Sequence, residues 1–123
     1  MNKESMEMLR AAGVDVQTAL NRFCGNDSLY AKYLKKFFDD PNYREAGAAL
    51  AASDWEEMLH AAHTLKGVAG NLGLDRLFET SGRIVAALRA GEHDAAAAAY
   101  AVLRGQYEEL SRAVEQMRER GLL

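Results

Sequence analysis

The chain has 123 residues and a formal net charge of −3, and no apolar run approaches the roughly 20 residues that span a bilayer. The acidic balance argues against nucleic-acid binding, for which a basic surface is expected. One proline among many alanine, leucine, glutamate and arginine residues predicts an all-α protein, and the length predicts one domain over residues 1–123. The charged amino terminus does not resemble a secretory signal, and the lone Cys24 fits a reducing compartment, so we expect a cytoplasmic protein.

Three short helices are predicted in the first third of the chain. The first covers residues 2–11 and ends at Gly13, a residue type suited to a helix C-terminus. The second is capped by Asp15, and Asn26 or Asp27 caps the third. Apolar pairs recur every four residues in the third helix and predict a broad aromatic face packed in the core: Leu29 and Tyr30, Tyr33 and Leu34, Phe37 and Phe38.

Pro41 is the only proline and falls between this helix and Ser53. Proline fits the first position of a helix and kinks a helix elsewhere. Either Asp40 caps a new helix that runs to Ala52, or one bent helix covers residues 28–52. We expect the bent helix.

A longer helix is predicted from a cap at Ser53 or Asp54 to Gly73. At about 100° per residue, one sector of this helix collects an apolar stripe that predicts a buried face. Its members are Trp55, Met58, Leu59, Ala62, Leu65, Ala69 and Leu72. His63 lies about 110° from the centre of this stripe, so we expect its ring at the edge of the buried face and in contact with solvent.

Two glycines follow His63 on nearly the same side of the helix, Gly67 and Gly70. Each costs about 1 kcal/mol relative to alanine inside a helix. Either a partner approaches the histidine over bare main chain, or the glycines allow close helix packing or end the helix. Lys66 lies one turn from His63, and its long stem can bring the ammonium near the ring. A cation there suits a ring that becomes negatively charged, as a phosphorylated one does.

Two further helices complete the prediction. The first is capped by Asp75 and ends at Gly91, and its inward face is expected to hold Leu77, Phe78, Ser81, Ile84, Val85 and Leu88. The second starts near His93 or Asp94 and shows a regular apolar seam: Tyr100, Leu103, Tyr107, Leu110, Val114 and Met117. Four substantial helices with short glycine-marked turns predict an antiparallel up-down four-helix bundle with additional short N-terminal helices.

The sequence His-Thr-Leu-Lys-Gly at residues 63–67, followed by Gly-Asn-Leu-Gly-Leu at residues 70–74, resembles the phosphorylation motif of histidine-containing phosphotransfer (HPt) domains. These domains relay phosphoryl groups between receiver domains in multistep two-component signalling. The likeness extends over most of the chain, from residues 13–37 to residues 88–92. It departs from the family at Val85, where many members carry a glutamate, and at Gly82 nearby, a region we expect to lie away from the histidine.

The resemblance implies that His63 accepts a phosphoryl group from a receiver-domain aspartate and passes it to another response regulator. It also places that group on the outer ring nitrogen, which the residues alone do not decide. An imidazole with an unperturbed pKa of ~6.5 is mostly neutral and nucleophilic at pH 7, so no general base is needed. Lys66, Gly67 and Gly70 are expected to support the site. Asn71 and Thr64 could contact a partner and are equally compatible with plain helix surface.

The same reading predicts a phosphoryl carrier rather than an enzyme. The chain has no carboxylate cluster for a metal, so it needs no cofactor of its own, and magnesium is expected on the partner receiver domain. The expected partners are receiver domains of hybrid sensor kinases and of response regulators, bound by a monomer. The sequence does not identify the upstream kinase, the downstream regulator or the signal. The chain is compatible with a free-standing shuttle and with a piece of a larger kinase.

Two other functions fit parts of the sequence. Glu57 and His60 match the Glu-x-x-His pattern of carboxylate-bridged di-iron bundles, but a second copy of the pattern is missing and His60 points away from the core stripe. An HPt-like bundle that docks a kinase or receiver without phosphotransfer is the other alternative. The intact His63 and Lys66 argue against it.

Overall fold

The computed structural model describes all residues, 1–123, and is all-helical, as the composition predicts. Its seven helices are α1 (Lys3–Ala11), α2 (Val16–Arg22), α3 (Asp27–Phe37), α4 (Asn42–Ala51), α5 (Trp55–Asn71), α6 (Asp75–Arg89) and α7 (His93–Glu119). None of them combines the length and the apolar composition that a membrane span requires.

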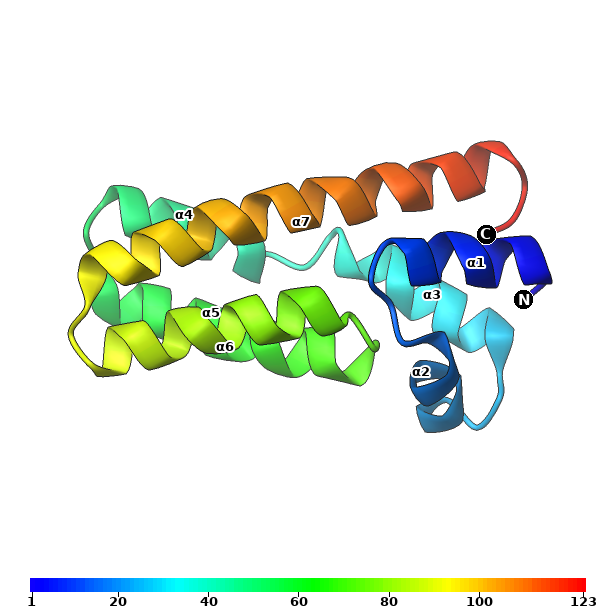
Figure 1. Ribbon diagram of the computed structural model, residues 1–123, viewed down its shortest axis with the longest axis horizontal. Coiled ribbons are helices and arrows are strands. Elements are labelled where there is room, and N and C mark those ends of the chain that lie inside the picture. The colour runs from blue at the N-terminus through cyan, green and yellow to red at the C-terminus, as the bar shows by residue number, and fades with distance from the viewer.

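Helices α4 to α7 form a helical bundle (Figure 1). Helix α5 packs against both α4 and α6, and α6 packs against α7. Helix α7 has 27 residues and runs along the whole molecule, from the bundle to α1 (Figure 1). The turns before α6 and α7 pass through Gly73 and Gly91 with φ of 70° and 71°, a left-handed conformation that glycine adopts without a steric penalty.

The apolar stripes predicted for α5 and α7 face the core. Of the stripe predicted for α5, Trp55 and Leu59 are partly buried, and the buried members are Met58, Ala62, Leu65, Ala69 and Leu72. On α7 the predicted seam is buried except at Tyr107, which is half-buried and stacks on Tyr43 with ring centroids 3.8 Å apart. These two faces, with their partners on α4 and α6, form one continuous hydrophobic core.

The bent helix predicted over residues 28–52 is wrong. Helix α3 ends at Phe37 and α4 starts at Asn42. The N-cap position of α4 is Pro41, which makes no side-chain capping bond. Asp40 precedes it, and its Oδ1 atom accepts a hydrogen bond from the Asn42 backbone N–H at 2.9 Å, which orders the turn between the two helices. The alternative, a new helix after Asp40, is therefore the closer description, and α3 and α4 follow one another along α7 (Figure 1).

Three side chains predicted to face the core are exposed: Leu29, Tyr33 and Phe78 are 38%, 45% and 40% accessible. Helix α3 buries the neighbouring stripe of Tyr30, Leu34 and Phe37, which leaves the adjoining Leu29 and Tyr33 on its open side. A helix packed on one side buries only one sector of its surface, and the paired apolar pattern of α3 is wider than that sector. The predicted Asp75 cap also differs, because Asp75 is the first residue of α6 and Leu74 precedes it without a side-chain capping bond.

The amino-terminal helices are fastened to the carboxyl end of α5. The Tyr30 hydroxyl donates to the Leu72 carbonyl at 2.7 Å, and the Asp15 N–H donates to the Gly73 carbonyl at 2.8 Å. The Arg22 guanidinium donates to the Gly70 carbonyl. Burial raises the pKa of the Tyr30 hydroxyl well above its usual range, so this phenol stays a hydrogen-bond donor. Helices α2 and α3 are thereby held against the last turns of α5.

Candidate functional site

His63 lies in the middle of α5 with its side chain exposed. The helix begins where Asp54 accepts a hydrogen bond from the Glu57 N–H at 3.1 Å, and it ends before Gly73. Because the stripe on the other side of the helix is buried, the rotation of α5 is fixed and His63 points to solvent. The predicted accessible position of the histidine is confirmed.

The two glycines beside His63 have different surroundings. A methyl group built on Gly67 would meet nothing within 4 Å, so the main chain one turn after His63 is open to an approaching molecule. A methyl group on Gly70 would lie 3.1 Å from Phe78 Cδ2, a tight contact. The prediction of bare main chain holds at Gly67 and is wrong at Gly70, where the ring of Phe78 on α6 occupies the space.

Lys66 extends from α5 toward α6. Its Nζ atom lies 5.4 Å from the centre of the Phe78 ring, within the range of a cation–π interaction. Its stem runs beside Gly82, where an added methyl group would lie 3.6 Å from Lys66 Cε. Gly82, in the region expected to lie away from the histidine, therefore contacts Lys66, a predicted supporting residue of the site.

The two polar candidates on α5 differ in what they contact. The Thr64 hydroxyl donates to the His60 carbonyl at 3.1 Å, a bond inside its own helix. Asn71 is exposed and lines a groove at the carboxyl end of α5. Of the two, Asn71 is therefore placed to meet a partner.

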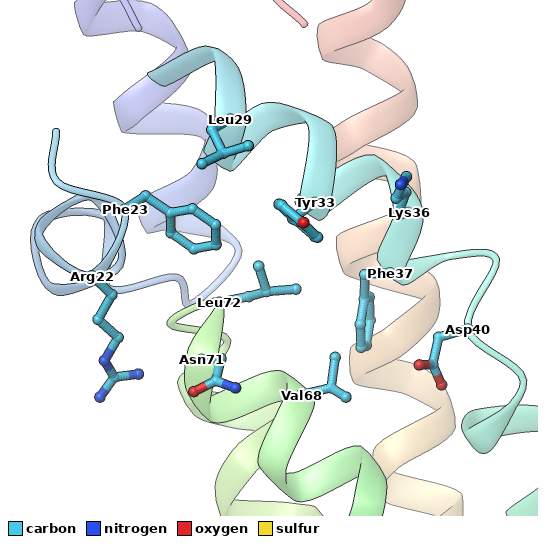
Figure 2. Close-up of a pocket in the computed structure, with 10 residues that line it drawn as sticks. All are labelled: Arg22, Phe23, Leu29, Tyr33, Lys36, Phe37, Asp40, Val68, Asn71 and Leu72. Atoms are coloured by element: carbon cyan, nitrogen blue, oxygen red, sulfur yellow. The ribbon is translucent and has the colours of Figure 1, made fainter. Parts of the chain in front are cut away.

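This groove has a volume of about 570 Å³ and lies between α3, the end of α2 and the last turns of α5 (Figure 2). Phe23, Leu29, Tyr33, Phe37, Val68 and Leu72 supply its apolar lining. Arg22, Lys36, Asp40 and Asn71 complete it. Its charged members are two cations, Arg22 and Lys36, and one anion, Asp40, so an apolar surface bordered by charges of both signs adjoins the helix that carries His63.

The groove residues on α2 and α3 were not predicted as a site. Leu29 and Tyr33 were assigned to the core, since a stripe of aromatic residues is most often buried. The usable signal was the width of the pattern: adjacent pairs repeating every four residues cover more of a helix than one packing contact can bury. On α5, Val68 and Asn71 lie about 7.5 and 12 Å from His63 along the helix axis at 1.5 Å per residue.

The Glu-x-x-His pattern gains no further ligands in the structure. Glu57 and His60 are both exposed, and no group of three or more His, Cys, Asp or Glu side chains is placed to hold a metal ion. The only cysteine, Cys24, is a free thiol on the surface.

The fold and the site together define an all-helical protein that presents an exposed histidine, with a lysine and open main chain one turn away, on one helix of a bundle. Comparison with protein families agrees with this class: the profile of the Hpt domain matches residues 34–118. This is well over half of the chain, and the chain belongs to the Hpt domain family. The matched range includes His63 and nearly all of α4–α7. No match was found among curated proteins or among solved structures.

Membership of this family places the protein in phosphorelay histidine phosphotransfer. Hpt domains interact with receiver domains in such relays. The family match starts inside α3, so the segment that supplies Phe23, Leu29 and Tyr33 to the groove precedes it.

Proposed function

We propose that His63 accepts a phosphoryl group from the phosphorylated aspartate of a receiver domain and later passes it to another response regulator. The observation that carries this proposal is the exposed His63 beside open main chain at Gly67. The neutral ring nitrogen attacks phosphorus, an N–P bond forms, and the P–O bond to the aspartate breaks with its electron pair leaving on the carboxylate. The reverse attack by a second receiver aspartate returns the nitrogen its electron pair.

The protein acts in this proposal as a carrier and not as an enzyme. Phosphoryl transfer needs positioning and charge stabilisation, which metal ions and lysine side chains usually supply. No metal-ligand group adjoins His63, so the receiver domain would bring magnesium and its own charged groups, and Lys66 is the one cation that this chain adds within a turn of His63.

We place the receiver domain over the groove and His63 together. The groove is continuous with the end of α5 through Val68, Asn71 and Leu72, so a receiver seated on its apolar lining lies beside the helix that carries His63. In the same proposal the protein is a monomer, and α4–α7 form the antiparallel up-down arrangement. The sequential contacts from α4 to α7 and the short turns between them support this topology.

Replacing His63 by glutamine tests the proposal. His63→Gln is expected to abolish acid-labile labelling by a phosphorylated receiver domain while the helical circular dichroism is unchanged, because His63 is exposed. His60→Gln is a matched control, since His60 is exposed on the same helix. Labelling that persists in His63→Gln, or that is lost only in His60→Gln, would refute the assignment. A receiver that binds the wild-type protein without labelling it would favour a docking module.

A further inference from the structure

We infer that Phe78 and Gly82 of α6 are positioning residues that hold the Lys66 ammonium on the α6 side of α5, one helical turn after His63, from where it pairs with a phosphoryl group on that histidine. The inference rests on the proposed function of His63. Lys66 lies about 4.5 Å beyond His63 along the helix axis. Its angular position on α5 directs its side chain toward α6. We call Phe78, Gly82 and Gly70 the lysine cradle.

The lysine cradle depends on two missing side chains. Phe78 reaches over α5 because Gly70 has no Cβ, since a methyl group there would come within 3.1 Å of the ring. The stem of Lys66 lies along α6 because Gly82 has no side chain, and an added methyl group would sit at ordinary contact distance, 3.6 Å from Cε. Alanine at residue 82 therefore fits, whereas a larger side chain would occupy the path of the lysine.

The cradle holds the ammonium without neutralising it. Glu79 and Arg83 line a shallow hollow together with Lys66, Phe78 and Gly82. Lys66 nevertheless takes part in none of the four ion pairs of the structure. Arg83 is instead turned to the Thr80 hydroxyl, to which it donates at 3.2 Å. An aromatic face attracts a cation weakly and leaves its charge in place. A phosphoryl group on His63 would thus have an unpaired cation one helical turn away.

Phosphorus NMR of the phosphorylated histidine tests this inference directly. The parent protein carries His60→Gln and His93→Gln, so that His63 is the only one of the three histidines left, and phosphoramidate supplies the phosphoryl group chemically. A nearby cation favours the dianionic phosphoryl group. Lys66→Ala is therefore expected to raise the midpoint of the phosphorus pH titration by about half a unit, allowing for solvent screening.

The cradle variants then separate positioning from packing. Phe78→Leu and Gly82→Leu should raise the midpoint as Lys66→Ala does, whereas Phe78→Tyr and Gly82→Ala should match the parent. The double variant Phe78→Leu, Lys66→Ala should show no further rise, because both changes remove one interaction. Parental midpoints in Phe78→Leu and Gly82→Leu, or additive effects in the double variant, would overturn the inference.

A second readout guards against misfolding and does not involve phosphate. In the unphosphorylated protein, the Lys66 ε-methylene protons should show an upfield ring-current shift from Phe78. This shift should be lost in Phe78→Leu and kept in Phe78→Tyr. An unshifted resonance in the parent would overturn the cradle. Because phosphoramidate needs no receiver, the two proposals can fail separately. Receiver labelling with parental midpoints in the variants overturns the cradle alone, and shifted midpoints without receiver labelling overturn the relay alone.

Discussion

The bundle α4–α7 and the amino-terminal helices α1–α3 contribute differently to one face of the protein. The bundle carries His63, Lys66 and Gly67 and falls almost wholly within the Hpt family match, which starts at residue 34. The amino-terminal helices carry no group of this site, and they supply Phe23, Leu29 and Tyr33 to the groove beside it.

The two regions share one hydrophobic core, to which α1–α3 contribute buried apolar residues of their own. Helices α2 and α3 are in addition fastened to the end of α5 by the bonds of Tyr30, Asp15 and Arg22 to backbone carbonyls there. Leu29 and Tyr33, on the open side of α3, are exposed, so this surface is free to vary. We infer that the bundle sets the chemistry and that the amino-terminal helices adapt the face to a partner.

After replacement of His63 itself, a bulky side chain at residue 67 is expected to have the largest effect on the rate of phosphoryl transfer. Gly67→Leu should slow transfer from a phosphorylated receiver by at least tenfold, since displacing a reacting group by about 1 Å can cost on the order of 100-fold. Helix propensity should meanwhile raise the thermal stability, because leucine is favoured over glycine in a helix by somewhat under 1 kcal/mol. Rapid-quench labelling and a thermal melt measure the two effects.

Gly105→Leu is the matched control for this change. Gly105 lies inside α7, is exposed, and has no atom within 4 Å of an added Cβ, so it gains the same propensity away from His63. Equal transfer rates in the Gly67 and Gly105 variants would remove steric access as the reason for glycine at residue 67.

A smaller effect, confined to partner binding, is expected from the groove. The double variant Leu29→Ser, Tyr33→Ser should weaken receiver binding on the order of tenfold, as loss of well-packed apolar anchors does. Labelling by phosphoramidate should be unchanged, because both residues belong to α3 and a small-molecule donor needs no docking surface. Calorimetry with the receiver and chemical labelling would be compared on the same samples.

Val102→Ser provides the control for lost surface hydrophobicity. Val102 is 46% exposed on α7 and does not line the groove. If it weakens binding as much as the double variant, the receiver does not dock where we place it. If the double variant also lowers chemical labelling, the division between chemistry and recognition fails.

The bundle was the more predictable of the two regions. Buried stripes at helical spacing predict the rotation of α5, and that rotation places His63 in an accessible position. Capping residues and glycines likewise predicted the start and the end of α5. The sequence does not predict the break between α3 and α4, because a proline allows either a kink or a new start and the hydrogen bond between Asn42 and Asp40 in the turn depends on local conformation.

The contacts between helices were the part that sequence could not supply. Gly67 and Gly70 look alike on a helical wheel, yet only Gly70 is covered, because the covering ring of Phe78 comes from another helix. The direction of Lys66 depends on Gly82 in the same way. The groove was hidden for a related reason: an apolar stripe reads as core until the sector already buried by Tyr30, Leu34 and Phe37 is known.

The smallest expected effect tests whether the bundle can be weakened without touching the site. Tyr100 of α7 is 4% exposed, and its hydroxyl donates to the Tyr43 carbonyl at 3.1 Å. Burial is the main cause that raises the pKa of Tyr100 to about 12. Tyr100→Phe should lower the free energy of unfolding by about 1 kcal/mol at pH 7, the usual net value of one hydrogen bond, and should leave the labelling of His63 unchanged.

The same hydroxyl should also make the stability of the folded protein depend on pH under alkaline conditions. In the unfolded chain the phenol has a pKa of ~10, whereas in the folded protein its pKa is about 12. The unfolded state therefore loses this proton first as the pH rises. The free energy of unfolding falls between these two pH values as a result. Tyr100→Phe should therefore show a shallower fall in stability above pH 10 than the wild type in urea unfolding. Tyr33→Phe, at an exposed position, should keep the wild-type slope. Equal slopes in the two variants would show that the Tyr100 hydroxyl is not held protonated by the bundle. A change in His63 labelling in Tyr100→Phe would show that Tyr100 and the proposed phosphoryl site are coupled.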